Sequence, residues 1–212
     1  FKGLVDELVS GPGEDALADM CGKKGGPFVS GVGFDYSALC LSRYLSPGTV
    51  LPYSTARGCY WKRCTFCPEK TEKGGYLSFN AKTVINDIQR LVKKTRPRLI
   101  HFLDNALSPG FLNQLIKNPP GVSWYGFTRI TEHLTDTSFV NGLKSSGCVM
   151  LKLGIESGDQ MVLDSLEKGI DLNTVSLALN TLKDASISIY AYLLFGTPSE
   201  NLKSARKPLI LH

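Results

Sequence analysis

The stretch RGCYWKRCTFCP, residues 57–68, holds three cysteines, Cys59, Cys64 and Cys67. A cubane 4Fe-4S cluster normally takes four cysteine thiolates, so a close group of three predicts a cluster whose fourth iron is open to another ligand. Zinc is the alternative, since closely spaced cysteines also bind zinc, but a structural zinc site needs four ligands. The other cysteines are scattered, and no histidine lies in the stretch. The spacing therefore favours iron–sulfur over zinc, and zinc over reduced structural cysteines.

The bulk composition is that of an ordinary globular domain. The chain has 212 residues, of which 42% are hydrophobic and 20% are charged. The net charge of +5 is spread along the chain without a basic stripe, so nucleic-acid binding is not indicated. Six cysteines are too few for a disulfide scaffold and indicate a reducing compartment, so we expect a cytoplasmic protein. The longest apolar run, 187–195, is much shorter than the ~20 residues of a membrane-spanning helix, and we expect no membrane segment.

β-rich runs alternate with segments of helical period along most of the chain. Helix signals include a capping Asn80, the pair Ser108-Pro109, and helices around 137–146, from 159 and over 172–184. Residues 1–22 read as a strand, a glycine turn and a helix. The strands are expected at 50–55, 99–103, 122–127, 149–155 and 187–195. This alternation predicts an α/β fold with parallel strands, either an open sheet or a barrel, whose site lies at the carboxyl ends of the strands.

Polar residues stand where each expected strand ends. We expect them to converge on one mouth, although each alone has a plain alternative as a helix cap or a surface ion-pair partner. An open iron needs a ligand with an amine and a carboxylate, for which Arg129 offers a bidentate partner. Glu156 can accept hydrogen bonds from ribose hydroxyls, and glycines allow close backbone approach. The candidates besides the three cysteines are Phe66, Asp104, Asn105, Arg129, Gly154, Glu156, Ser157, Gly196 and Glu200.

The cysteine stretch, with Phe66 before its last cysteine, resembles the cluster loop of the radical S-adenosylmethionine (radical SAM) superfamily. Leu153–Ser157 looks like that superfamily's ribose motif after the fourth strand, and Phe195–Glu200 looks like its motif after the fifth. Thr128-Arg129 also has a counterpart there. The spacing C-x4-C differs from the commonest C-x3-C, and Leu103-Asp104-Asn105 stands where a Gly- and Glu-rich motif is usual. The resemblance covers most of the chain.

A narrower resemblance lies upstream. Phe34-Asp35-Tyr36, Tyr44–Pro47 and Val50–Pro52, together with Gly11–Glu14, look like the junction that follows a cobalamin-binding domain in the B12-associated branch. The chain lacks an initiator Met and ends without a turn signal, so we expect a fragment. The expected organisation is the tail of a cobalamin-binding-type domain over 1–22, a linker over 23–49, and over 50–212 a truncated, TIM-barrel-like core, a partial (βα)6 barrel with about five of its six units.

The resemblance implies a radical SAM enzyme. Cys59, Cys64 and Cys67 would hold the 4Fe-4S cluster, and the other candidates would contact S-adenosylmethionine, which is cleaved to a 5'-deoxyadenosyl radical that abstracts hydrogen from an unknown substrate. It also implies an external reductant, flavodoxin or ferredoxin. Methyl transfer, with cobalamin, is expected only in the intact protein. Two other classes stay open: an electron-transfer protein whose cluster has a fourth thiolate, from Cys40 or Cys148, and a zinc-stabilised binding module.

Overall fold

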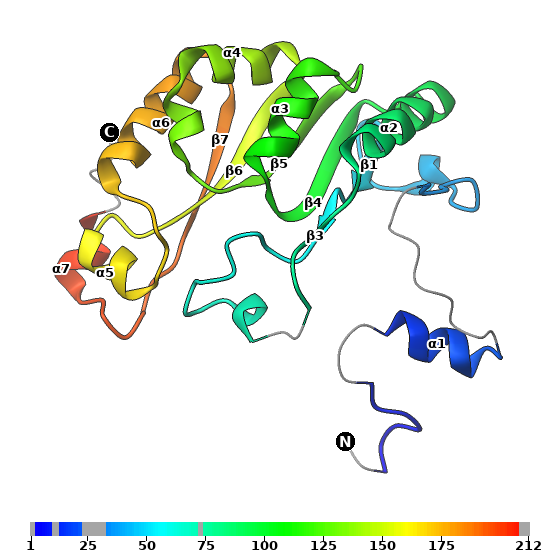
Figure 1. Ribbon diagram of the computed structural model, residues 1–212, viewed down its shortest axis with the longest axis horizontal. Helices are drawn as coiled ribbons and strands as arrows, with labels where there is room; N and C mark the ends of the chain where they lie inside the picture. Colours follow the sequence, from blue (N-terminus) through cyan, green and yellow to red (C-terminus); the bar gives the residue numbers. More distant parts are fainter. Residues whose placement is uncertain (1–2, 10–12, 23–32, 72–73, 208–212) are drawn as a thin grey trace.

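Five parallel strands form a sheet whose order follows the chain (Figure 1). The computed structural model describes residues 3–9, 13–22, 33–71 and 74–207. Each strand after the first lies beside its predecessor, which confirms the parallel pairing and the alternation expected from the sequence. In sheet order the strands are β1 (Val50–Tyr53), β4 (Leu99–Leu107), β5 (Ser123–Thr128), β6 (Cys148–Glu156) and β7 (Ser188–Leu193).

The four long helices lie on one face of the sheet (Figure 1): α2 (Ala81–Thr95), α3 (Pro109–Lys117), α4 (Thr137–Ser145) and α6 (Leu172–Asp184). Their starts follow the expected capping chemistry. The Asn80 side chain accepts from Thr83 N at 3.1 Å, and the Ser108 hydroxyl accepts from Phe111 N at 3.2 Å. The other elements are α1 (Glu14–Met20), α5 (Gln160–Ser165), α7 (Leu202–Ala205), the 3-10 helices η1 (Leu41–Arg43), η2 (Pro68–Lys70) and η3 (Glu132–Thr135), and the antiparallel pair β2 (Ala56–Arg57) and β3 (Leu77–Ser78).

The core lies between the sheet and these helices. Val84 and Ile88 of α2 are completely buried, as are Trp124 of β5 and Leu151 of β6. Burying a large aliphatic or aromatic side chain contributes roughly 1.5–3 kcal/mol. Because the helices use one face of the sheet, the other face of the strands is left to carry the polar and aromatic side chains described below. None of the helices in the described part of the chain is both long enough and apolar enough to cross a membrane.

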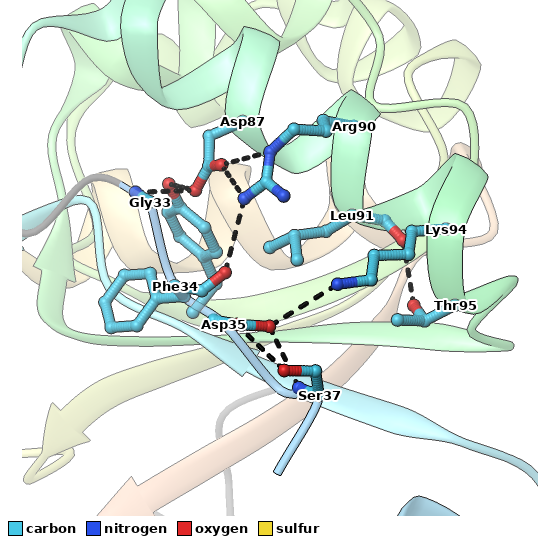
Figure 2. A network of polar contacts seen from close by, with 10 residues as sticks. Gly33, Phe34, Asp35, Ser37, Asp87, Arg90, Leu91, Lys94 and Thr95 are labelled. Atoms are coloured by element: carbon cyan, nitrogen blue, oxygen red, sulfur yellow. Dashed lines mark hydrogen bonds and ion pairs between the residues drawn. The ribbon is translucent and has the colours of Figure 1, made fainter. Parts of the chain in front are cut away.

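Residues 33–37 of the upstream segment are bound to α2 (Figure 2). The buried carboxylate of Asp87 accepts from Gly33 N and from the Tyr53 hydroxyl, both at 3.0 Å, and Arg90 pairs with it at 2.6 Å. Lys94 reaches Asp35 at 3.5 Å. Residues 33–37 thus lie along the first long helix, at the start of the barrel-like core. The remaining upstream residues of the expected linker, 23–32, lie outside the described residues.

Two expectations about element bounds differ from the structure. Residues 3–9 form a turn and an isolated bridge residue rather than the expected strand; a strand needs a partner along its length, and residues 3–9 form no such ladder with the described residues. The helix expected after this segment is present as α1, whereas residues 10–12 of the glycine turn lie outside the described residues. β4 runs on past Leu103 to Leu107, and in this extension the buried carboxylate of Asp104 accepts hydrogen bonds from Thr55.

Candidate functional site

A cavity of about 540 Å³ opens at the carboxyl ends of the strands. It extends from the three-cysteine loop, 57–68, across the face of the sheet that the long helices leave uncovered. This volume lies within the usual range for a small-molecule site. The cavity is lined by Cys59, Cys64, Phe66, Cys67, Pro68, Glu69, His101, Phe102, Leu103, Asp104, Asn105, Ala106, Phe127, Arg129, Lys152, Glu156, Lys168 and Tyr192.

The three cysteines line one end of the cavity. Cys64 is buried, Cys59 and Cys67 are half-buried, and Cys67 N donates to Cys64 O at 3.2 Å. Burial raises the pKa of the Cys67 thiol, and the two neighbouring cysteines raise it further. Among the described residues no three His, Cys, Asp or Glu side chains converge as they would around one metal ion. In a cubane cluster each thiolate ligates a different iron, whereas a structural zinc site takes four ligands around one ion.

The cysteine loop is held against the turn that follows α5. Thr65 N donates to Leu166 O at 3.0 Å, and the indole of Trp61 donates to Glu167 O at 3.1 Å. Gly169 has a left-handed backbone with φ of +64°, and a Cβ built there would lie 2.1 Å from the Trp61 ring. The indole therefore occupies the space that any other residue at 169 would fill. The loop is docked by contacts far away in sequence.

Arg129 lies directly after β5 and is buried beside the loop. Its guanidinium stacks on the Trp61 ring at 4.2 Å and donates to Lys168 O. Its Nη1 approaches Cys64 Sγ at 3.9 Å. A permanent positive charge is thus fixed at the cysteine end of the cavity, in agreement with the expectation that Arg129 lies at the mouth formed by the strand ends.

Glu156, the last residue of β6, forms a buried ion pair with Lys168 at 2.8 Å. Its backbone is left-handed, with φ of +66°, which is a strained conformation for a residue with a side chain and is typical of functional sites. Gly154 provides room for the pair, because a Cβ there would lie 2.5 Å from the Glu156 carboxylate and 2.7 Å from the Lys168 ammonium. The close approach expected at Gly154 is therefore to protein groups.

Asp104 and Asn105, the two candidates in the second half of β4, already have hydrogen-bond partners within the protein. The Asp104 carboxylate accepts from Thr55 N at 3.0 and 3.1 Å and from the Thr55 hydroxyl at 2.7 Å. Burial raises its pKa, while the bonds from Thr55 oppose that shift. The amide of Asn105 donates to Glu69, which lies two residues beyond Cys67. Both residues line the cavity, yet their nearest contacts join β4 to the region around the cysteine loop.

The last group of candidates lies beside the cavity rather than on its wall. Ser157 is completely buried, and its hydroxyl accepts from Asp159 N at 3.1 Å. After β7, Gly196 N donates to the Glu200 carboxylate at 2.6 Å. Glu200 Oε1 and the Thr197 hydroxyl are buried without a hydrogen-bond partner among the described residues. Leu194 N donates to Glu156 O at 2.9 Å, so this turn is fastened next to Glu156.

The opposite end of the cavity is basic and aromatic. Lys152 Nζ lies 3.0 Å from His101 Nε2 and 5.1 Å from the centre of the Tyr125 ring. The His101 imidazole stacks on Tyr125, with centroids 4.3 Å apart and planes at 5°. Burial, and then the nearby Lys152 charge, lower the pKa of His101. Phe127 and Tyr192 lie on the same wall.

The structure thus brings most of the expected residues together. The three cysteines, Phe66, Asp104, Asn105, Arg129 and Glu156 line one cavity, whereas Gly154, Ser157, Gly196 and Glu200 stand behind or beside it. Lys168, Lys152 and His101 also line the cavity but were not among the candidates chosen from the sequence. In the sequence, Lys168 is marked only by its position just before a glycine. Lys152 and His101 are marked only by the alternation of side chains along a strand, which places them on one face.

Comparisons with known proteins agree with this architecture. No protein-family profile matches the chain. It is 28% identical over 155 residues, 70% of this chain and 28% of the relative, to the anaerobic magnesium-protoporphyrin IX monomethyl ester cyclase of Rubrivivax gelatinosus. It is 24% identical over 225 residues, 94% of this chain and 47% of the relative, to an uncharacterized methyltransferase of Pyrococcus horikoshii. The chain spans about a quarter to a half of the length of these curated relatives.

Solved structures share the fold. The cobalamin-dependent S-adenosylmethionine radical enzyme OxsB, with aqua-cobalamin and S-adenosylmethionine bound, superposes with a TM-score of 0.62 at 18% identity, over 76% of this chain and 26% of that one. Coproporphyrinogen III oxidase (HemN) from Escherichia coli, described as a radical SAM enzyme, gives a TM-score of 0.53 at 14% identity, over 97% of this chain and 51% of that one. The five-stranded parallel sheet is therefore similar in fold to the barrels of these two enzymes.

Proposed function

We propose that this chain is a radical SAM enzyme core whose cavity holds a 4Fe-4S cluster together with S-adenosylmethionine, and its similarity in fold to radical SAM enzymes supports the proposal. One observation carries the proposal: Cys59, Cys64 and Cys67 line the end of the cavity that the carboxyl ends of the strands surround. With three protein thiolates, one iron of a cubane cluster stays open to a small-molecule ligand. When bound, the cluster and the cofactor supply a one-electron reductive cleavage that yields a carbon radical for hydrogen abstraction.

The chain's own residues have distinct roles in this proposal. Arg129 fixes the cysteine loop through Trp61 and adds positive charge near Cys64, which favours a carboxylate ligand at that end. Glu156 holds a carboxylate at the cavity wall, oriented by its ion pair with Lys168, where it can accept from hydroxyl donors such as those of a ribose. Further polar groups come from the buried oxygens of Thr197 and Glu200, which have no hydrogen-bond partner in the part of the chain that the structure describes.

The cluster would draw its electron from an external donor, which we propose to be a flavodoxin or a ferredoxin. For an intact protein that also carries a cobalamin-binding domain, we extend the proposal to methyl transfer. Two of the similar proteins support this extension: OxsB is described as cobalamin-dependent, and the relative from Pyrococcus horikoshii is described as a methyltransferase.

Low-temperature EPR of the anaerobically reconstituted, dithionite-reduced chain tests the proposal. We expect a reduced 4Fe-4S signal that changes shape when S-adenosylmethionine is added. Cys64→Ala should lose the signal and Cys148→Ala should keep it, because Cys148 is buried at the start of β6 outside the cavity lining. A signal indifferent to S-adenosylmethionine, or lost in Cys148→Ala, would favour an electron-transfer cluster with a fourth thiolate. Stoichiometric zinc without iron would favour a zinc module.

A further inference from the structure

The end of the cavity away from the cysteines contains a cation, Lys152, that has no anionic partner among the described residues. Lys152 forms no ion pair with any described residue, and its one close polar neighbour is His101 Nε2 at 3.0 Å. The carboxylates that line the cavity are already engaged: Asp104 with Thr55, Glu156 with Lys168, and Glu69 with Asn105. A half-buried ammonium group is costly to leave without a counter-charge, so a ligand that brings one is favoured.

The hydrogen-bond geometry indicates which charge is needed. An ammonium group only donates, so Lys152 donates to His101 Nε2, and the imidazole keeps its proton on Nδ1. Two protons of Lys152 remain for another acceptor. The lowered pKa of His101 keeps the imidazole neutral at pH 7, so the pair carries a single positive charge. A monoanion such as a carboxylate matches that charge, whereas a phosphate would need more.

Aromatic rings flank the cation on its sheet. Lys152 is in register with Phe127 of β5 on one side and with Tyr190 of β7 on the other. Tyr192 follows two residues later, in contact with the Phe127 and Tyr190 rings. Tyr190 and Tyr192 are 52% and 39% exposed, which is unusual for large rings on a sheet face. Rings in this arrangement favour stacking on a flat, unsaturated body.

Lys152 lies in the middle of β6, away from the carboxyl end of that strand. Lys152 precedes Glu156 by four residues on β6, which corresponds to roughly 13 Å at about 3.3 Å per residue. We propose that His101 and Lys152 bind the carboxylate of a substrate with a flat, aromatic or conjugated body, held against Phe127 and Tyr192. This inference rests on the proposed function for its chemistry, since it names the substrate class of the same cavity.

Binding of a simple probe tests the inference without turnover. We would titrate the full chain, before and after cluster reconstitution, with 2-naphthoate and with its uncharged analogue 2-naphthamide, by isothermal titration calorimetry. We expect 2-naphthoate to bind about tenfold more tightly than the amide, as one charge-assisted hydrogen bond would give. Lys152→Met should abolish that preference, and His101→Gln should reduce it. Lys82→Met, which removes an exposed charge from α2, should leave it intact.

Equal binding of acid and amide, absence of binding, or an unchanged preference in a folded Lys152→Met variant would overturn the inference. A second reading is that Lys152 serves the carboxylate of S-adenosylmethionine itself. The EPR change caused by S-adenosylmethionine should persist in Lys152→Met, and its loss in that variant alone would also overturn the inference. If the wild-type chain shows no such EPR change, the proposed function fails, while the calorimetry still decides whether the carboxylate site exists.

Discussion

Replacing Gly169 by alanine tests whether contacts with the turn after α5 hold the cysteine loop in place. The added Cβ would lie 2.1 Å from Trp61 Cζ2 and 2.5 Å from Cη2, so the indole has to move. Moving it breaks its hydrogen bond to Glu167 O and its stacking with Arg129. A net hydrogen bond contributes about 1 kcal/mol and a cation–π contact about 0.5–1 kcal/mol. The left-handed backbone at 169 adds about 1–2 kcal/mol for any residue with a Cβ.

We therefore expect Gly169→Ala to lower the free energy of unfolding by about 3 kcal/mol, measured by urea denaturation of the apo chain. Gly121→Ala is the matched control, because Gly121 also has a left-handed backbone, with φ of +79°, and nothing lies within 4 Å of the position that its Cβ would take. Gly121→Ala should lower the free energy of unfolding only by the cost of the left-handed backbone, about 1–2 kcal/mol. Gly169→Ala should also reduce iron bound per chain after reconstitution, whereas Gly121→Ala should not.

A double variant separates the clash from the backbone cost. With Trp61→Leu already present, the further change Gly169→Ala should cost no more than Gly121→Ala does, since the ring that blocks residue 169 is gone. The reasoning is refuted if Gly169→Ala and Gly121→Ala are equally destabilising in the wild-type background and bind equal iron. In that case the indole would not be what docks the loop.

Three further predictions concern titratable and charged groups. Lys168→Met should cost about 3–5 kcal/mol in urea denaturation because Glu156 is left buried and unpaired, and adding Glu156→Gln should restore most of the loss. Burial raises the pKa of Cys148 from 9.0 to about 12, so the contribution of its neutral thiol to stability is complete below pH 9 and is lost as the pH rises towards 12. Over that range the free energy of unfolding should therefore fall less for Cys148→Ala than for the wild-type chain. Equal slopes of unfolding free energy against pH would contradict this. The pKa of His101 is lowered below 6.5, so the contribution of its neutral ring to stability is present above pH 6.5 and is lost as the pH falls. Lys152→Met should raise the pKa of His101, measured by NMR titration. A pKa that does not move would show that the Lys152 charge is not acting on the ring.

The candidate residues whose position at the cavity could be expected from the sequence are those placed by strand ends. Arg129 follows β5 and Glu156 ends β6, and the carboxyl ends of parallel strands share one edge of a sheet, so finding the strands was enough to bring these two together. Asp104 reached the cavity by the same rule, although its strand runs on to Leu107. The rule gives the neighbourhood of a residue but not the direction of its side chain. Ser157 accordingly points into the protein, where it accepts from Asp159 N.

Lys168 could not have been found in the same way. It lies in a turn between two left-handed residues, Glu167 and Gly169, and this backbone directs a long cationic side chain into the protein, where it is only 3% exposed. A lysine next to a glycine normally predicts a helix end on the surface. Only tertiary contacts, the Glu156 carboxylate and the room left by Gly154, make the buried position favourable.

The two ends of the cavity are built on different kinds of structure, and this should separate the effects of variants. The cysteines stand on a loop that depends on Trp61, Arg129 and the turn at 165–169 for its position. His101 and Lys152 stand in the middle of β4 and β6, where ladder hydrogen bonds fix the backbone. Sites on regular elements are held more rigidly than sites on loops. Loosening the loop should therefore reduce iron binding while the preference for a carboxylate survives, and changing the basic pair should do the reverse.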